Sequence, residues 1–487
     1  MLQQKLKDPS LLKCAGFING QWVQTKTEKV FEVFNPSTGD VVANVADLGV
    51  KETQLAIDAA QAAFEKWREV PAKQRSSLLR RWFDLVMENQ EDLALIMTFE
   101  QGKVIAESRG EVAYGASYIE WFAEEAKRIY GDILPSTTSD RRSLVIKQAV
   151  GVVGAITPWN FPNAMITRKV APALAAGCTI VLKPASETPL SALALAELAD
   201  RAGFPAGVFN VITGTDSKAI GAELTSNPIV KKITFTGSTA VGKILMEQSA
   251  KTVKKTSMEL GGNAPVLIFE DADLDKAVEG ALIAKFRNAG QTCICANRIL
   301  VQDSIYEEFI RRFTARVSEF VLGDGLSSTS TMGPLITKKA VAGVVSLVDD
   351  AVSLGAKVCI GGSVGSNGDY FFEPTVLRDL SASMRLAKEE VFGPVAPVFK
   401  FSSEKEAVAM ANDTEFGLAA YMYTKDHARI WRVGEALEYG MVGINETAIS
   451  SEMIPFGGVK ESGQGREGSK YGLEDYLEIK YLCMGDI

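Results

Sequence analysis

The segment CTIVLKPAS at residues 178–186 decides the fold class, because it begins a run in which strand-like and helix-like patterns alternate at short intervals. Apolar and β-branched residues fill its first half, and a lysine and a proline follow, as at the end of a buried strand. The alternation continues with a predicted helix, strand, helix and strand at Ser191–Ala202, Gly207–Ile212, Ala219–Leu224 and Lys232–Thr236. Such alternation predicts parallel βαβ units and therefore an α/β protein.

Further predicted elements lie on both sides of this run. Residues 51–126 have helical spacing and few glycines or prolines, with Leu55 and Trp67 on the expected apolar face, so we expect a layer of helices there. A second alternating region runs from residue 264 to 401 and predicts a second α/β layer. The apolar, strand-like segment Leu473–Met484 is expected to complete another sheet, including a sheet shared with a partner chain.

The composition of the 487 residues excludes several classes of function. Sixty acidic residues outnumber 52 basic ones and give a net charge of -8, so nucleic acid is not an expected partner. The chain has one histidine and six dispersed cysteines, which argues against a histidine-rich metal site and for a reducing compartment. Neither a signal peptide nor a long apolar run is evident. We therefore expect a cytoplasmic protein that binds neither metal nor membrane.

Two segments suggest nucleotide binding, although neither is specific by itself. Residues 233–242, ITFTGSTAVG, predict a strand, a glycine turn and a helix, and a helix N-terminus can bind phosphate. The three-glycine dinucleotide motif is absent, so an ordinary strand-to-helix turn remains the alternative. Lys183 ends another predicted strand, where it could reach a ribose or a phosphate or simply be solvated.

A thiol and a carboxylate are the candidate reactive groups. Cys293 follows a predicted amphipathic helix in the loop NAGQTC, whose glycine allows close approach of a substrate. Glu259 ends a probable strand directly before Leu260 and two glycines; burial there would raise its pKa and make it a base near neutral pH. The alternatives are a small buried cysteine and an exposed acid.

Taken together, these segments resemble the aldehyde dehydrogenase superfamily over about residues 15–485. Seven motifs in order carry the resemblance: PWNFP at 158–162, KPAS at 183–186, FTGS at 235–238, ELGG at 259–262, GQTC at 290–293, EVFGP at 390–394 and PFGGVK at 455–460. The resemblance implies three parts. A Rossmann-type cofactor domain at residues 1–131 and 149–258 is joined to an α/β catalytic domain at 259–471. A small β oligomerisation element at 132–148 and 472–487 would support a homotetramer or homodimer.

The resemblance also implies roles for individual residues. Cys293 would be the nucleophile, Glu259 the general base that activates water, and Asn160 the oxyanion donor, assisted by the backbone N–H of Cys293. A base that activates water favours hydrolysis of the thioester over transfer to coenzyme A. The residues that would bind the cofactor are Trp159, Asn160, Lys183, Pro184, Ala185, Ser186, Gly237, Ser238, Leu260 and Glu390.

One position bears on the choice between NAD and NADP. Strictly NAD-dependent relatives usually carry an acid at the serine of KPAS, where it accepts the ribose hydroxyl and repels a 2′-phosphate. Ser186 removes that repulsion, and Lys183 could pair with the phosphate. We therefore expect NADP to be preferred and NAD to be accepted, although Glu187 is an adjacent acid that works against NADP.

Within the superfamily the chain is most similar to succinate-semialdehyde dehydrogenases, through residues 160–178, 286–298 and 465–483. This resemblance implies that Arg168 and Arg287, with the hydroxyl of Ser450, hold the distal carboxylate of a small anionic aldehyde, since arginine matches carboxylates in a bidentate fork. Either arginine could instead pair with an acid of the protein. Glutarate and 2-oxoglutarate semialdehydes are alternative substrates. A cofactor-independent thiol hydrolase and a catalytically silent relative are alternatives from other classes.

Cys295 lies two residues beyond the expected nucleophile and is a candidate redox partner for it. In an extended segment the two side chains would point the same way, at the edge of disulfide reach. A nucleophilic Cys293 would favour the thiolate, so it should be the first thiol to oxidise, and a nearby second thiol would make that oxidation reversible. The alternative is that Cys295 only fills apolar space.

Overall fold

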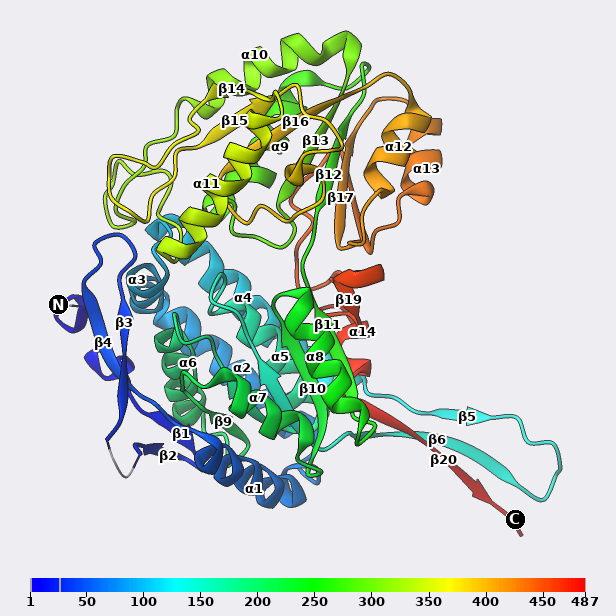
Figure 1. The fold of residues 1–487 in the computed structure, drawn as a ribbon. Coiled ribbons are helices and arrows are strands. Elements are labelled where there is room, and N and C mark those ends of the chain that lie inside the picture. The colour runs from blue at the N-terminus through cyan, green and yellow to red at the C-terminus, as the bar shows by residue number, and fades with distance from the viewer. Residues whose placement is uncertain (1, 26–27, 487) are drawn as a thin grey trace.

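A largely parallel sheet forms the centre of each of the two lobes of the computed structural model, which describes residues 2–25 and 28–486 (Figure 1). The strands of the first sheet are β1 (Gly16–Ile18), β2 (Gln21–Val23), β7 (Val152–Ile156), β8 (Thr179–Lys183), β9 (Phe209–Val211), β10 (Val230–Thr236), β11 (Lys255–Glu259) and β19 (Gly463–Gln464). Their order is β19-β11-β10-β7-β8-β9-β1-β2, and the five strands from β11 to β9 are parallel. The predicted βαβ alternation and α/β class are confirmed.

The register of this sheet brings the predicted functional segments to one edge. Glu259 at the end of β11 lies opposite Thr236 of β10, and Lys183 at the end of β8 lies opposite Ile156 of β7. Parallel strands have their carboxyl ends at the same edge, which is where α/β proteins bind ligands. The loop after β7, which carries Asn160, therefore leaves the sheet at the same edge as Glu259, with β10 between the two strands.

Helices cover both faces of the first sheet. They are α1 (Val50–Trp67), α2 (Ala72–Glu88), α3 (Gln90–Gln101), α4 (Ile105–Glu125), α5 (Ala164–Ala176), α6 (Pro189–Ala202), α7 (Ser217–Ser226) and α8 (Thr239–Ala250). Adjacent residues of β7 point to opposite faces: Val152 packs in a cluster with Ile57 of α1, and Val153 packs in a cluster with Trp82 of α2. Strands with two buried faces explain the nearly continuous apolar runs of the sequence.

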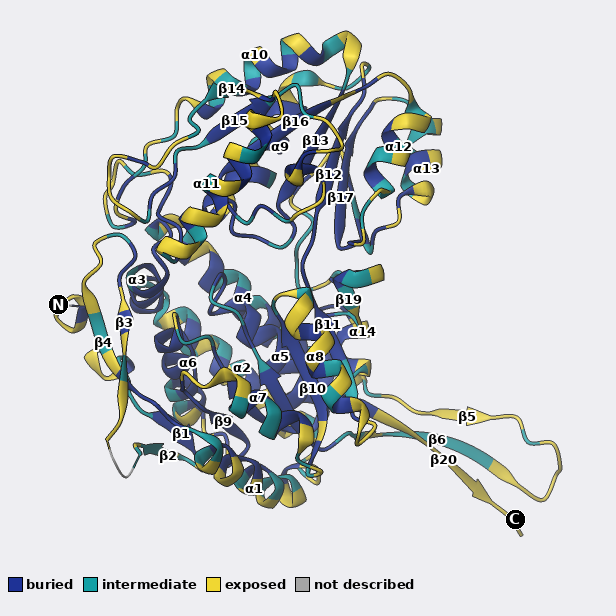
Figure 2. Cartoon of the chain, in the orientation of Figure 1, coloured by how far each residue is buried: buried dark blue, intermediate teal, exposed yellow. Residues whose placement is uncertain are grey.

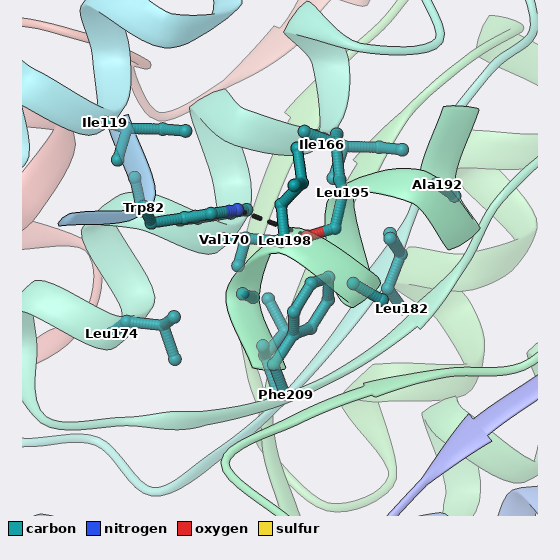
Figure 3. Close-up of a cluster of buried hydrophobic side chains, with 14 of the residues drawn as sticks. Trp82, Ile119, Ile166, Val170, Leu174, Leu182, Ala192, Leu195, Leu198 and Phe209 are labelled. Atoms are coloured by element: carbon teal, nitrogen blue, oxygen red, sulfur yellow. Dashed lines mark hydrogen bonds between the residues drawn. The ribbon is translucent and has the colours of Figure 1, made fainter. Parts of the chain in front are cut away.

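The predicted helices of residues 51–126 are present as α1 to α4, but they do not form one layer: α1 packs on one face of the sheet, and α2 to α4 pack on the opposite side against α5 and α6. Trp82 is buried on this opposite side, and its indole Nε1 donates a hydrogen bond to the carbonyl of Leu195 on α6 at 3.2 Å (Figure 3). The expected apolar face of α1 was partly wrong, because Leu55 is 58% exposed. The helix buries Ala56 and Ile57 instead, since its many alanines leave the orientation of the face undetermined by sequence.

The second lobe contains the sheet β14-β15-β16-β13-β12-β17-β18. Its strands are β12 (Ala264–Ile268), β13 (Ala296–Gln302), β14 (Lys357–Ile360), β15 (Thr375–Arg378), β16 (Val395–Phe401), β17 (Ala419–Tyr423) and β18 (Met441–Ile444). Its helices are α9 (Leu274–Phe286), α10 (Tyr306–Val317), α11 (Lys338–Ser353), α12 (Glu404–Asn412) and α13 (His427–Ala436). The connection from α9 to the central strand β13 carries Cys293 toward the first lobe.

Two smaller sheets lie at the periphery. One pairs β3 (Val30–Phe34) with β4 (Val41–Ala46), and the other contains β5 (Asp132–Leu134), β6 (Arg142–Ala149) and β20 (Leu477–Met484). The second forms an arm that projects from the first lobe, and much of its surface is exposed (Figure 2). The expected terminal strand begins later than predicted, because Tyr471–Glu474 forms the short helix α14, whose Leu473 is buried in the core of the lobe.

None of the helices within residues 2–25 and 28–486 is both long enough and apolar enough to cross a membrane.

Candidate active site

The loop that carries Cys293 has an unusual backbone and is held by buried polar contacts. Asn288 and Ala289 have φ angles of 52° and 54°, in the left-handed region. The backbone N–H of Asn288 donates to Glu107 Oε1 at 2.7 Å, and Gln101 Nε2 donates to Asn288 Oδ1 at 3.1 Å. The loop conformation is therefore fixed by the helical layer of the other lobe.

Cys293 lies in a turn, in which the N–H of Cys295 donates to the carbonyl of Thr292 at 3.0 Å. The segment from Cys293 to Cys295 is therefore bent by this hydrogen bond and is not extended. Cys295 is buried, and its thiol donates to the carbonyl of Lys285 at 3.2 Å. The redox pairing of the two thiols remains a prediction.

One cavity, of about 250 Å³, joins the thiol to most of the residues expected to bind the cofactor. Its lining includes Trp159, Asn160, Gly237, Ser238, Leu260, Cys293 and Glu390. Phe392 adds an aromatic wall, with its ring edge-to-face with Trp159 at a centroid distance of 5.5 Å. The nucleophile candidate thus faces the cavity at the carboxyl edge of the first sheet.

A second, narrow cavity of about 20 Å³ contains the same thiol and the predicted carboxylate-binding residues. It is lined by Tyr114, Phe161, Met165, Arg168, Arg287, Thr292, Cys293, Ile294, Ser450 and Phe456. Because Cys293 and Met165 belong to both linings, the thiol lies where the two cavities meet. The larger cavity is suited to a cofactor, whereas the smaller one, between cationic and aromatic side chains, has room in this structure for about one water molecule.

The two arginines of the second cavity differ in their surroundings. Arg168 is fully buried, and its Nε lies 2.8 Å from Glu467 Oε2, while its guanidinium stacks over Phe456 at 3.9 Å. Its Nη2 hydrogen-bonds to none of the described residues, so it retains a donor for a ligand. Arg287 is exposed, and no carboxylate of the described residues forms an ion pair with it. It packs over Phe161 at 5.0 Å.

Glu259 is a buried carboxyl group, only 3% exposed, rather than an exposed acid. Burial, followed by the negative charge of Glu467, raises the pKa of Glu259 well above its ordinary value. Its Oε2 hydrogen-bonds to none of the described residues, which leaves that oxygen available to a water or substrate group. A carboxylate with a raised pKa is suited to general base catalysis near neutral pH.

Glu467 was not found by the sequence analysis, although it is the residue that links the charges around Glu259. It accepts a hydrogen bond from Lys169, which also donates to Thr236 Oγ1 at 2.6 Å, and it pairs with Arg168. Burial alone would raise the pKa of Glu467, but these two cations hold it below its ordinary value. No local spacing in the sequence could have indicated this contact between distant segments.

The surroundings of Cys293 favour the neutral thiol, contrary to the expectation that it would favour the thiolate. Burial raises the pKa of Cys293 to about 12, and the nearby carboxyl of Glu390 contributes in the same direction. The removal of the thiol from water raises its pKa more than the positive charge of Arg168 lowers it. The thiol must therefore lose its proton when the reaction begins.

The amide of Asn160 lines the first cavity together with Cys293. Its Nδ2 donates one hydrogen bond to the carbonyl of Gln291 at 2.9 Å, which leaves the second amide hydrogen free. The backbone carbonyl of Asn160 accepts hydrogen bonds from Lys103 Nζ at 2.8 Å and from Asn288 Nδ2 at 3.0 Å. The amide is thereby tied directly to the segment that ends in Cys293.

The remaining predicted cofactor residues lie further along the sheet edge. Lys183, Pro184 and Ala185 line neither cavity described above. The Nζ of Lys183 donates to the carbonyl of Pro184 at 2.9 Å, and burial lowers the pKa of Lys183 to about 8. Ser186 and Glu187 line a separate cavity of about 230 Å³ beside β3, where Ser186 Oγ donates to Glu187 Oε2 at 3.2 Å.

The first cavity has the features that a dinucleotide cofactor requires. Helix α8 begins there, with Ser238 at its N-cap and free backbone N–H groups suited to phosphate. A side chain at Gly261 would lie 3.0 Å from Glu390 Oε2, so this glycine keeps the cavity open beside the carboxyl group. Burial raises the pKa of Glu390 to about 8, and its Oε1 accepts from the N–H of Gly262. The residues that line this cavity therefore fit a dinucleotide cofactor.

A comparison with known families identifies the chain. The profile of the aldehyde dehydrogenase family matches residues 22–482. The chain belongs to the aldehyde dehydrogenase family. A relative named as an NADP(+) succinate-semialdehyde dehydrogenase, from Escherichia coli strain K12, is 60% identical over 481 residues, 99% of this chain and 100% of the relative. A glutarate-semialdehyde dehydrogenase of Pseudomonas aeruginosa is 59% identical over 483 residues, 99% of this chain and 100% of that protein.

Solved structures of the aldehyde dehydrogenase family confirm the fold. The crystal structure of an E. coli NADP-dependent enzyme has a TM-score of 0.98 and 59% identity and covers 99% of this chain and 100% of that chain. The expected resemblance and the expected fold class are both confirmed. Membership over nearly the whole length also argues against the alternative of a thiol hydrolase that uses no nucleotide.

Proposed function

We propose that the protein oxidises succinate semialdehyde to succinate, with NADP as the preferred and NAD as the accepted cofactor. One observation carries the proposal: Arg168, Arg287 and Ser450 line the same small cavity as Cys293. Two cations beside a thiol favour an aldehyde with a distal carboxylate, because a neutral aldehyde would leave a partly unpaired Arg168 buried. The close relative from E. coli, named for this substrate and for NADP, supports the assignment.

The proposed reaction uses the protein groups in a fixed order. The thiol of Cys293 gives its proton to solvent water and attacks the aldehyde carbon, and the amide hydrogen of Asn160 left free by Gln291 stabilises the alkoxide that forms. The bound cofactor supplies the hydride acceptor. A thioester to Cys293 then remains, and Glu259 takes a proton from the water that hydrolyses it. One aldehyde and one water give one carboxylic acid, and the reduced cofactor is released.

The network around Glu259 supports its role in hydrolysis. Lys169 and Arg168 hold Glu467 ionised, and the charge of Glu467 in turn disfavours ionisation of Glu259. Glu259 therefore keeps a high proton affinity, while its unpartnered Oε2 is available to water. Thioester hydrolysis requires a strong base whose carboxylate is not already paired with a cation.

Glutarate semialdehyde is a second candidate, because the P. aeruginosa relative named for it is nearly as similar. The test measures kcat/KM for succinate, glutarate and 2-oxoglutarate semialdehydes and for propanal, each with NADP and NAD. We expect the highest kcat/KM for succinate semialdehyde with NADP. The value for propanal should be at least about tenfold lower, because propanal has no carboxylate and loses one charged hydrogen bond. Equal values for propanal and the anionic aldehydes would contradict the proposal.

Cofactor preference is proposed to depend on Ser186. Its hydroxyl lies in a cavity with Glu187, so the position can accept a phosphate more readily than an acid could. Replacing Ser186 with Glu should lower kcat/KM for NADP by at least about tenfold, a repulsion of about 1.4 kcal/mol, and change that for NAD much less. A parallel loss with both cofactors would show that Ser186 does not contact the 2′-position.

We further propose that cofactor binding belongs to residues 1–131 and 149–258, and catalysis to residues 259–471. The arm at 132–148 and 472–487 is assigned to self-association, because Ile133 and Ile479 are 80% and 74% exposed on it. Light scattering should give a mass of two or four chains, and deletion of residues 477–487 should reduce it. The cytoplasmic location expected from the sequence is tested by fractionation of the source cells.

A further inference from the structure

The loop between α3 and α4 places one buried ammonium group directly against the backbone of Asn160. Lys103 is 2% exposed. Its Nζ donates to Glu111 Oε2 at 2.5 Å and to the carbonyl of Asn160 at 2.8 Å, and it lies over the ring of Phe161 at 4.1 Å. Neither Lys103 nor Glu111 lines a cavity described above, so these residues do not touch a substrate or cofactor bound there.

The contacts of this pair fix the Asn160 loop at both of its ends. The carbonyl of Asn160 has two lone pairs, and Lys103 Nζ and Asn288 Nδ2 fill them. Glu111 Oε1 accepts from the N–H of Asn163 at 2.8 Å and of Ala164 at 3.2 Å, where α5 begins. The lysine therefore holds the peptide from which the Asn160 side chain projects, and the glutamate holds the following turn.

The backbone of the same loop reaches the cysteine segment. The N–H of Lys103 donates to Gln101 Oε1 at 2.9 Å, and Gln101 Nε2 donates to Asn288 Oδ1 at 3.1 Å. The side chain of Asn160 in turn donates to the carbonyl of Gln291. A closed set of buried hydrogen bonds therefore fixes the position of Asn160 relative to the segment that ends in Cys293.

A buried ion pair is weak evidence for stability, because desolvation offsets the attraction of the charges. Precise placement is the better explanation, since an oxyanion donor acts only within a narrow range of positions. We propose that Lys103 is a positioning residue that holds Asn160 in the geometry for oxyanion stabilisation. The inference rests on the proposed function of Cys293 and Asn160.

The first test compares reactions of Cys293 that do and do not form an oxyanion. In the double variant K103M/E111Q both charges are removed, while the amide oxygen that E111Q introduces can still accept from the start of α5. We expect kcat for the aldehyde and the acylation rate with p-nitrophenyl acetate to fall by about 10–100-fold, as for a displaced donor. The KM for NADP and the rate of alkylation by iodoacetamide should change by less than about threefold, because alkylation forms no oxyanion.

A matched control removes a buried lysine elsewhere. Lys232 is fully buried and donates to Ser257 Oγ. It lies in the amino-terminal half of β10, whereas the loops that carry Asn160 and Cys293 lie at the carboxyl edge of the sheet. K232M should leave the ratio of ester acylation to alkylation unchanged, even if it lowers the Tm. If K103M/E111Q does not fold, K103Q, which keeps an uncharged donor, replaces it and should show a smaller drop in the same ratio.

A double-mutant cycle decides whether Lys103 acts through Asn160. In an N160A background, K103M/E111Q should cause no further loss of ester acylation. A further loss equal to that in the wild type, or alkylation that falls together with acylation, would overturn the proposal. If the wild type acylates on the ester but does not oxidise the aldehyde, the proposed function is wrong, and the ester and alkylation rates still decide the role of Lys103.

Discussion

Arg287→Met is the substitution that most directly tests substrate recognition. The guanidinium lines the cavity that contains Cys293, and no described carboxylate pairs with it. Methionine keeps the aliphatic stem over Phe161 and removes only the charge and the donors. The substitution should therefore weaken the binding of an anionic aldehyde without disturbing the fold.

The magnitude follows from the contact that is lost. A hydrogen bond to a charged group contributes about 1.5–3 kcal/mol, which corresponds to about 10–150-fold in kcat/KM. Arg287 is exposed, so water screens the interaction, and we expect the lower end, about 10–30-fold, for succinate semialdehyde. The value for propanal should change by less than about twofold, since propanal carries no carboxylate.

Arg168→Met should behave differently because Arg168 is already paired. Its removal leaves the buried Glu467 with Lys169 alone, so we expect a loss of about 3–5 kcal/mol of stability in addition to the loss of activity. Arg109→Met, which removes an exposed arginine paired with Glu91 on the surface, is the control.

The assay measures kcat/KM for both aldehydes at saturating NADP, together with Tm for each variant. Equal losses for succinate semialdehyde and propanal in R287M would refute the reasoning and make Arg287 structural. A fall in the Tm of R287M as large as that of R168M would do the same.

The other predictions concern the thiols and the base. Cys293→Ala should abolish oxidation while NADP binding, measured by fluorescence titration, stays unchanged. Glu259→Gln should still form about one reduced cofactor per site in a burst, but steady turnover should fall by about 10²–10⁴-fold. The increase of steady turnover with pH should also be lost in this variant. Unimpaired turnover would exclude Glu259 as the base. Because the pKa of Cys293 is about 12, its alkylation rate should rise about tenfold per pH unit between about pH 7 and 10, and a plateau there would contradict that value. Peroxide inactivation should be reversed by dithiothreitol in the wild type but not in Cys295→Ala; equal recovery would leave Cys295 as a packing residue.

The sequence by itself determined the fold class and the identity of the reactive groups. The βαβ alternation around residues 178–236 follows from local periodicity, which depends on neighbours in the chain. The register of the parallel strands then places Gly237 beside Glu259, where the N–H of Gly237 donates to the carbonyl of Glu259 at 3.0 Å. The motif around Cys293 was recognisable for the same reason, since it is a continuous stretch of residues.

Some local expectations failed where tertiary contacts outweighed local pattern. Leu55 is exposed because the alanines of α1 allow more than one face to pack. Burial in the assembled site keeps the thiol protonated, although a nucleophile of this kind was expected to ionise readily.

Only the tertiary structure decided how the reactive groups are supported. Glu467 meets Arg168, and Lys103 meets Asn160, across segments that are remote in sequence, so no spacing could reveal them. The position of the thiol between two cavities likewise arises only when the loop from one lobe reaches the sheet edge of the other. These contacts depend on how separately formed layers pack, because the desolvation and pairing of charges are set by three-dimensional proximity and not by order along the chain.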